Sequence, residues 1–191
     1  MGGGGENHLT PAPPLRRFLD RLYTWSGALA ALCVFAIFAL MLAQAFGREA
    51  GVLVRGADDL SAWLTAAAAF FALGHTFRHG ELVRMGLAIE GLPPRARWWS
   101  ELAALSVTAL FTGWMTWAVA SFVYDSWRFH EVAQGLITIP IWIPQLAFAL
   151  GVLILLIAVL DDLVAVLRHR KPAYQLAEEE RRARGDFSES V

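Results

Sequence analysis

Two histidines are the side chains best suited to chemistry in this sequence. His75 and His79 are four residues apart, so on a helix they share one face. Because haem iron takes axial imidazole ligands, His75 is a candidate haem ligand in a membrane anchor of a redox enzyme. The competing interpretation, a pair of histidines near a membrane interface, is favoured because His130 and His169 lie outside the apolar runs and supply no facing ligand.

Other catalytic signatures are missing from the sequence. It has no His-Glu-x-x-His, no nucleophile elbow and no phosphate-binding loop. Cys33 is the single cysteine and lies inside an apolar run, which excludes an internal disulfide and favours a packing role. We therefore expect no enzyme activity and no cofactor, with a structural phospholipid as the single candidate. No basic block suggests a nucleic-acid partner.

Four long apolar runs dominate the chain, and 57% of its 191 residues are hydrophobic. They cover residues 22–46, 60–77, 102–124 and 141–160, and none contains Asp, Glu, Lys or Arg. A helix crosses a hydrocarbon core of about 30 Å with about 20 apolar residues. The sequence predicts an all-α membrane protein with four transmembrane helices. Uncharged spans argue against a proton relay or an ion path. A cleaved signal peptide is the alternative for the first run, which is longer than the apolar core of such peptides.

Basic residues mark one side of the membrane. Ten lie close to the start of the first run, between the second and third, or close to the end of the fourth: Arg16, Arg17, Arg21, Arg78, Arg84, Arg95, Arg97, Arg168, Arg170 and Lys171. Three flank the other ends: Arg48, Arg55 and Arg128. Lys and Arg collect on the cytoplasmic side of membrane proteins, so both termini are expected in the cytoplasm. Loops 47–59 and 125–140 are then periplasmic, in a bacterial inner membrane.

The sequence divides into three parts. Residues 1–14 are rich in Gly and Pro and are expected to be disordered, residues 15–168 form the membrane domain, and residues 169–191 form a charged cytoplasmic tail. Between the second and third runs, residues 79–92 combine an apolar stripe with charges. This composition predicts an amphipathic helix in the membrane interface, with an ordinary connecting loop as the alternative.

Several residues outside or beside the runs are candidate interface or membrane anchors. Asp58 and Asp59 are expected to cap the second helix, and Pro140 and Pro144 to begin the fourth. Small residues such as Gly27, Gly74 and Gly113 allow close helix contacts, and polar residues such as Gln44, Thr65 and Thr116 are expected to hydrogen-bond between helices. The candidate anchors are Arg78, Glu81, Arg84, Trp98, Trp99, Asp58, Asp59, Pro140 and Trp142.

Four short motifs in a fixed order resemble a known family. They read DDLSAWL at 58–64, RHGELVRMGL at 78–87, GLPPRARWW at 91–99 and IPIWIPQLAFALG at 139–151. Together they resemble the DctQ-type small membrane subunit of TRAP transporters, over roughly residues 15–168. Two positions depart from the family pattern: Leu82 stands where a His is common, and Gly86 where an acidic residue is common.

The resemblance implies a division of labour between three proteins. A large membrane subunit carries the substrate and sodium sites, and a periplasmic binding protein delivers the substrate, usually an organic acid. The small subunit braces the large one and can contact the binding protein and membrane lipids. A weaker alternative is a stand-alone channel or small exporter, which the uncharged spans disfavour for ions.

Overall fold

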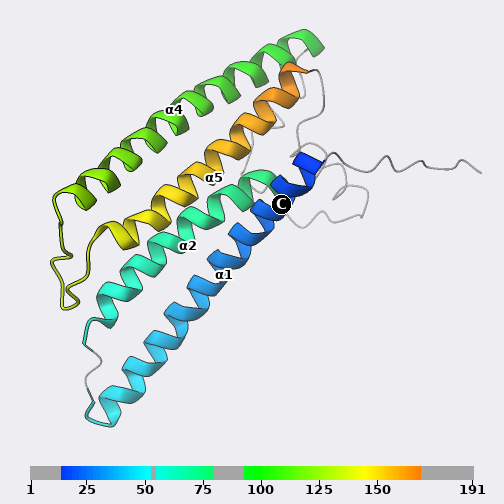
Figure 1. Ribbon diagram of the computed structural model, residues 1–191. Coiled ribbons are helices and arrows are strands. Elements are labelled where there is room, and N and C mark those ends of the chain that lie inside the picture. Colours follow the sequence, from blue (N-terminus) through cyan, green and yellow to red (C-terminus); the bar gives the residue numbers. More distant parts are fainter. Residues whose placement is uncertain (1–13, 53–54, 80–92, 169–191) are drawn as a thin grey trace, which may run out of the picture.

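The protein is built from four long helices. The computed structural model describes residues 14–52, 55–79 and 93–168, which contain α1 (Pro14–Glu49), α2 (Ala57–His79), α4 (Pro94–Arg128) and α5 (Trp142–Leu167) (Figure 1). Each helix is long and apolar enough to cross a membrane. The predicted all-α fold with four spans is confirmed, and the chain is a multi-pass membrane protein.

Local backbone chemistry sets where the helices begin and end. Gly56, at φ +78°, makes the left-handed turn that leads into α2, a conformation that glycine adopts without steric penalty. Pro94 is the first residue of α4, where its missing N–H leaves no helical hydrogen bond unmade. His130 takes φ +54° just after α4 and ends that helix. Pro140 precedes α5, and Pro144 lies in its first turn, as expected.

The helices stand in an open row. α1 lies against α2, α2 against α5, and α5 against α4, whereas α1 and α5 barely touch (Figure 1). Only α2 and α5 have a neighbour on both sides, so α1 and α4 form the two edges of the row. A closed bundle would bury one face of every helix, but here much of the apolar surface of α1 and α4 is left uncovered.

The α2–α5 seam is the tightest contact in the row. A Cβ on Gly151 would fall 2.6 Å from Cβ of Phe70 and 2.8 Å from its carbonyl oxygen. On Gly74, a Cβ would meet the side chain of Ile154 at 2.7 Å. The Phe70 and Phe148 rings pack beside this contact, with centroids 5.4 Å apart. Glycines therefore let the two central helices approach almost backbone to backbone.

Polar groups reinforce the α1–α2 seam. The buried Ser26 hydroxyl donates a hydrogen bond to the Phe71 carbonyl oxygen. The imidazole of His75 packs on Gly27, and its Nδ1 lies 3.1 Å from the Tyr23 carbonyl oxygen. These hydrogen bonds satisfy polar groups where little water is available.

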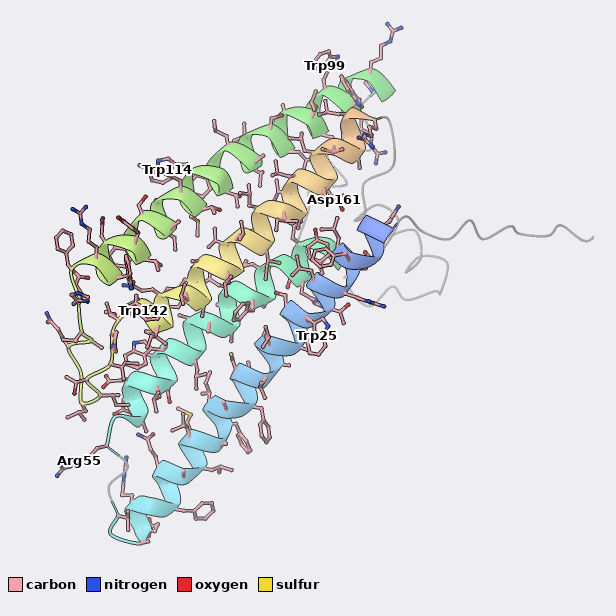
Figure 2. All side chains as sticks on the ribbon, in the orientation of Figure 1. Trp25, Arg55, Trp99, Trp114, Trp142 and Asp161 are labelled. Atoms are coloured by element: carbon pink, nitrogen blue, oxygen red, sulfur yellow. The ribbon has the colours of Figure 1, made fainter. Side chains whose placement is uncertain are left out.

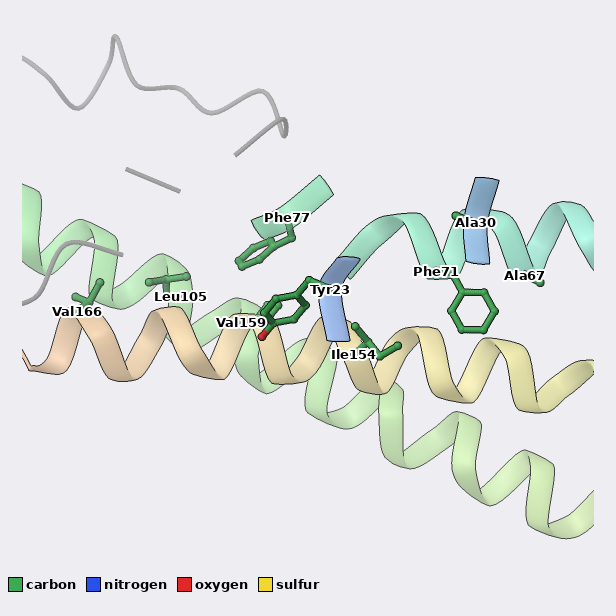
Figure 3. Close-up of a cluster of buried hydrophobic side chains, with 10 residues drawn as sticks. Tyr23, Ala30, Ala67, Phe71, Phe77, Leu105, Ile154, Val159 and Val166 are labelled. Carbon is green, nitrogen blue, oxygen red and sulfur yellow. The ribbon is translucent and has the colours of Figure 1, made fainter. Parts of the chain in front are cut away.

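The largest buried cluster lies where α1, α2 and α5 meet, with a contribution from α4. Tyr23, Phe77 and Val159 belong to it, together with Leu105 of α4 (Figure 3). Tyr23 and Val159 are almost completely buried. The cluster therefore joins all four helices near the end of the row where α1 begins.

The row has two ends that differ in what they contain. We call the end with the α1–α2 and α4–α5 connections the loop end, and the end with the start of α1 and the finish of α5 the terminal end (Figure 1). The predicted interfacial helix at 79–92 lies outside the described residues, apart from His79, which ends α2. The segment 1–14, apart from Pro14, and the tail 169–191 also lie outside them.

Candidate interaction site

The connection between α4 and α5 is folded back on itself at the loop end. We call residues 129–141 the α4–α5 loop. The Ala133 N–H donates to the Ile139 carbonyl oxygen at 2.9 Å, and Val132 pairs with Pro140 as an isolated antiparallel bridge. Pro140 therefore contributes to the loop as well as introducing α5. Backbone hydrogen bonds across its base give this loop a defined shape.

A buried serine ties the base of the α4–α5 loop to α4. The Ser126 hydroxyl donates to Glu131 Oε2 at 2.8 Å, and the Glu131 N–H donates to the Ser126 carbonyl oxygen at 3.0 Å. Ser126 is fully buried, so its hydroxyl needs this acceptor. The reciprocal pair fixes the direction in which the chain leaves α4.

Asp59 fastens the tip of the same loop to α2. Its Oδ2 accepts a hydrogen bond from the Leu136 N–H at 2.9 Å, and the carboxylate packs on Gly135 so closely that a Cβ there would collide with it. Next to this contact, the Ile137 side chain packs on Gly56. A charged acceptor makes a stronger hydrogen bond than a neutral one. Asp59 thus connects the start of α2 to the α4–α5 loop, two segments that are far apart in sequence.

Asp58 makes a separate contact with α1. Its Oδ1 accepts a hydrogen bond from Gln44 Nε2 at 3.1 Å. Both acidic residues lie in the first turn of α2, where the helix dipole favours negative charge. The structure uses them to join α2 to α1 and to the α4–α5 loop. Their role as caps of α2 stays a prediction beside these two cross-links.

Two of the candidate tryptophans lie together at the terminal end. Trp98 Nε1 donates to the Val166 carbonyl oxygen at 3.2 Å and so connects the start of α4 to the last turn of α5. Its ring meets Trp99 edge to face, with centroids 4.8 Å apart. Trp99 is exposed and projects outward from α4 (Figure 2). Trp142, the first residue of α5, lies half-buried at the opposite end of the row.

The predicted basic anchor is only partly within the described residues. Arg78 is the penultimate residue of α2, while Glu81 and Arg84 lie outside the described ranges. Within those ranges, Arg97 pairs with Glu101 at 3.2 Å on the surface of α4. Arg78, Glu81 and Arg84 stay predictions as anchors.

His75 lies inside the chain's own packing. Its Nδ1 faces the Tyr23 carbonyl oxygen, and its ring packs on Gly27 in the α1–α2 seam. Within residues 14–52, 55–79 and 93–168, no three His, Cys, Asp or Glu side chains are grouped to hold a metal ion. The geometry gives His75 a structural role, and nothing in it supports the haem alternative.

Several hydroxyls behave differently from expectation. Thr65, Thr108 and Thr116 were candidates for bonds between helices, but each donates to the carbonyl oxygen four residues earlier in its own helix. This local bond competes with bonding to a neighbour because the carbonyl is always within reach of the side chain. Of the candidate polar residues, Gln44 is the one that bridges two helices here.

Two polar residues of α5 are buried, which the structure reveals and the sequence does not. Asp162 is 1% exposed and lies inside α5, which continues to Leu167 instead of ending near Leu160. Gln145 is 4% exposed near the start of α5. The apolar run ends before Asp162, so the sequence puts Asp161 and Asp162 at the cytoplasmic end of the fourth span. The signal that could have found it is spacing, because Val159, Asp162 and Val166 share one helix face.

The comparisons agree with the family motifs. The family model described as tripartite ATP-independent periplasmic transporters, DctQ component, matches residues 37–169. No curated protein and no solved structure matches the chain. The match includes α2, α4 and α5 in full, about the last third of α1 and the whole loop end. The chain therefore belongs to the DctQ component family of tripartite ATP-independent periplasmic transporters.

Proposed function

We propose that the chain is the non-catalytic small membrane subunit of a sodium-coupled TRAP transporter. It braces the large transport subunit for uptake of an organic acid that a periplasmic binding protein delivers. The observation that carries the proposal is the open row of helices within a family of transporter components. An open row leaves both edges and both faces free for another membrane protein.

The absence of charge in the middle of the spans supports the bracing role. Transport of a sodium ion or a carboxylate through a chain requires polar or charged groups at mid-membrane. The runs at 22–46, 60–77, 102–124 and 141–160 contain none. The transport chemistry therefore belongs to the large subunit, and the small subunit supplies shape and anchoring. A structural phospholipid between the two subunits is part of this proposal.

The α4–α5 loop is the proposed contact with the periplasmic binding protein. Asp59 and the Ser126–Glu131 pair hold the loop in place. Held in this way, it exposes the large apolar side chains of Phe129, Val132 and Leu136. A fixed loop with exposed apolar side chains suits a protein partner, since little ordering is needed on binding.

The charge pattern orients the proposed subunit in the bacterial inner membrane. Arg95 and Arg97 flank α4 at the terminal end, and Arg168 follows α5 there. The loop end carries Arg48, Arg55 and Arg128. Among the basic residues close to the spans, the ratio of ten to three favours cytoplasmic termini and a periplasmic loop end.

A pull-down from native membranes tests the function directly. The tagged chain is extracted in mild detergent, and the proteins that accompany it are identified by mass spectrometry. We expect a large polytopic membrane protein in near-equal amount. Recovery of the chain alone, under conditions that keep other membrane complexes intact, would refute the subunit role. A colourless preparation without a Soret band is the matching expectation for His75.

A further inference from the structure

The two edges of the row differ in the polar atoms that they expose. Among the described residues, α1 packs mainly on α2 and weakly on α5, and α4 packs mainly on α5. Both helices therefore present wide apolar surfaces to whatever surrounds the protein. The question for each edge is whether acyl chains alone can cover it.

The outer face of α4 carries a stripe of large side chains at helical spacing. We call this set the α4 stripe: Val107, Leu110, Phe111, Trp114 and Trp117. Leu110 is 77% exposed, and the two tryptophans are 62% and 68% exposed. Trp114 projects from α4 on the side away from α5 (Figure 2). The stripe has no cover within the part of the chain that the structure describes.

The two tryptophans of the α4 stripe lie deep in the span. Arg97 and Arg128 bracket α4, so the middle of the span falls near residue 112 or 113. At 1.5 Å per residue, Trp114 is about 2 Å and Trp117 about 7 Å from that middle. Half of a hydrocarbon core is about 15 Å. Tryptophans usually lie at the membrane interface, where water can accept from the indole N–H.

Neither indole has an acceptor within the row. Among residues 14–52, 55–79 and 93–168, the Trp114 and Trp117 N–H groups make no hydrogen bond, whereas Trp98 donates to Val166. The Trp114 ring lies tilted beside the Phe111 ring, which offers no acceptor atom, with centroids 6.4 Å apart. A polar N–H among acyl chains loses its hydrogen bond to water and gains none.

The outer face of α1 has no such requirement. Its exposed mid-span side chains include Leu32, Phe35, Phe38 and Met41, and none of these has an N–H or O–H group. Its one tryptophan, Trp25, lies toward the terminal end. The most apolar window of α1 also has a higher mean hydropathy than that of α4. Lipid tails can therefore cover α1 without leaving a donor unpaired.

We propose that the α4 stripe is the surface on which the large membrane subunit packs, with acceptor groups of that subunit opposite Trp114 and Trp117. The inference rests on the proposed function and adds which edge is the interface. A second copy of this chain fits less well, because a symmetric contact of the stripe would bring indole donors against indole donors. Acyl chains supply no acceptor at this depth.

Photo-crosslinking in membranes tests the location. Benzoylphenylalanine is placed at Leu110 in the α4 stripe and, as matched controls, at Phe38 on α1 and Leu153 on α5, all of which are exposed. We expect an adduct with the large subunit from position 110 and none from 38 or 153. An adduct from either control position without one from position 110 would overturn the proposal, as would a homodimer or only lipid adducts at 110.

A double substitution tests the hydrogen bonds. Trp114→Phe with Trp117→Phe keeps two aromatic rings and removes both N–H groups. With about a 2.8-fold loss for each average interhelical hydrogen bond, we expect about eight-fold less large subunit retained during a detergent titration. Trp25→Phe is the matched control, expected to change nothing. Equal retention in all three proteins would refute the donor role.

These experiments separate the two levels of the proposal. If the unmodified chain recovers no large subunit, the proposed function fails and the α4 stripe loses its partner. If the large subunit is recovered but the double variant and position 110 behave like their controls, the function stands and the assignment of the interface to α4 is wrong.

Discussion

The α2–α5 seam and the outer face of α1 are similar in composition and opposite in packing. Both consist of aliphatic and aromatic side chains at membrane depth. In the seam, Gly151 and Gly74 bring one helix onto the other until a methyl group has no room. On α1, Phe35, Phe38 and Met41 extend into the surroundings with more than half of their surface exposed.

This difference shows that apolarity alone does not decide which surfaces pack in a membrane. Lipid tails are as apolar as leucine, so burying a leucine against another helix gains little from the hydrophobic effect. Close approach and polar bonds decide instead. Of the two inner seams, the α1–α2 seam has both, since Gly27 packs on His75 and the Ser26 hydroxyl donates to the Phe71 carbonyl oxygen, and the α2–α5 seam has the close approach at Gly151.

The largest expected effect is obtained by widening the α2–α5 seam. Gly151→Leu places a side chain against the Phe70 backbone, which cannot move aside by a rotamer change. We expect the free energy of unfolding in mixed micelles to fall by about 3 kcal/mol, the upper range for overpacking. Gly113→Ala is the matched control, because a Cβ there meets only Leu156 at 3.9 Å. Equal effects of the two changes would mean that close approach does not define the seam.

A buried carboxylate provides the next largest effect. Asp162 is 1% exposed inside α5, so its carboxyl group depends on partners within the protein instead of water. We expect Asp162→Ala to lower the free energy of unfolding by about 2–3 kcal/mol, because the groups packed around the carboxyl lose their partner. Asp161→Ala, at the half-buried neighbour, is expected to have a smaller effect. An unchanged free energy of unfolding in Asp162→Ala would show that this side chain does not stabilise the packed terminal end.

The sequence predicts the spans well because each helix carries its own signal. An uninterrupted apolar run such as 22–46 predicts a membrane span from its own length and composition, whichever helices lie beside it. The order of helices in the row has no such signal, since every side of a membrane helix is apolar whether it faces lipid or protein. The contact of Gly27 with His75 therefore appears only in the structure, although the small residue itself is visible in the sequence.

The candidate site was only partly predictable for the same reason. The sequence identifies Asp59 as a candidate anchor. It cannot give the partner of this side chain, because the Leu136 N–H lies 77 residues away in the chain. The apolar run stops at Leu160 and so puts Asp162 at the end of the fourth span, whereas the helix continues for two further turns and buries this residue. Hydropathy measures insertion and does not locate the end of a helix that extends past the membrane core.

Releasing the α4–α5 loop should have a moderate effect confined to the loop end. Asp59→Ala removes the acceptor for the Leu136 N–H. We expect the free energy of unfolding to fall by about 1.5–2 kcal/mol, the lower part of the range for a hydrogen bond to a charged group, because this bond is exposed to solvent. Amide hydrogen exchange should rise in residues 129–141 and stay unchanged in the α2–α5 seam. Asp58→Ala, which removes only the exposed contact with Gln44, is the control. Faster exchange throughout the chain would contradict a local role.

The smallest effect is expected on the outer face of α1. Phe38→Ala in the isolated chain removes a side chain that lies against no other helix, so no cavity forms and the free energy of unfolding should change by less than about 0.5 kcal/mol. Phe71→Ala, the matched change in the buried cluster, should lower it by about 3 kcal/mol, because it leaves a cavity between α1, α2 and α5. Similar losses for the two variants, measured in the same mixed micelles, would mean that Phe38 is packed after all. In that case the edge of the row would lie elsewhere, and the contrast between the inner seams and the outer face of α1 would not hold.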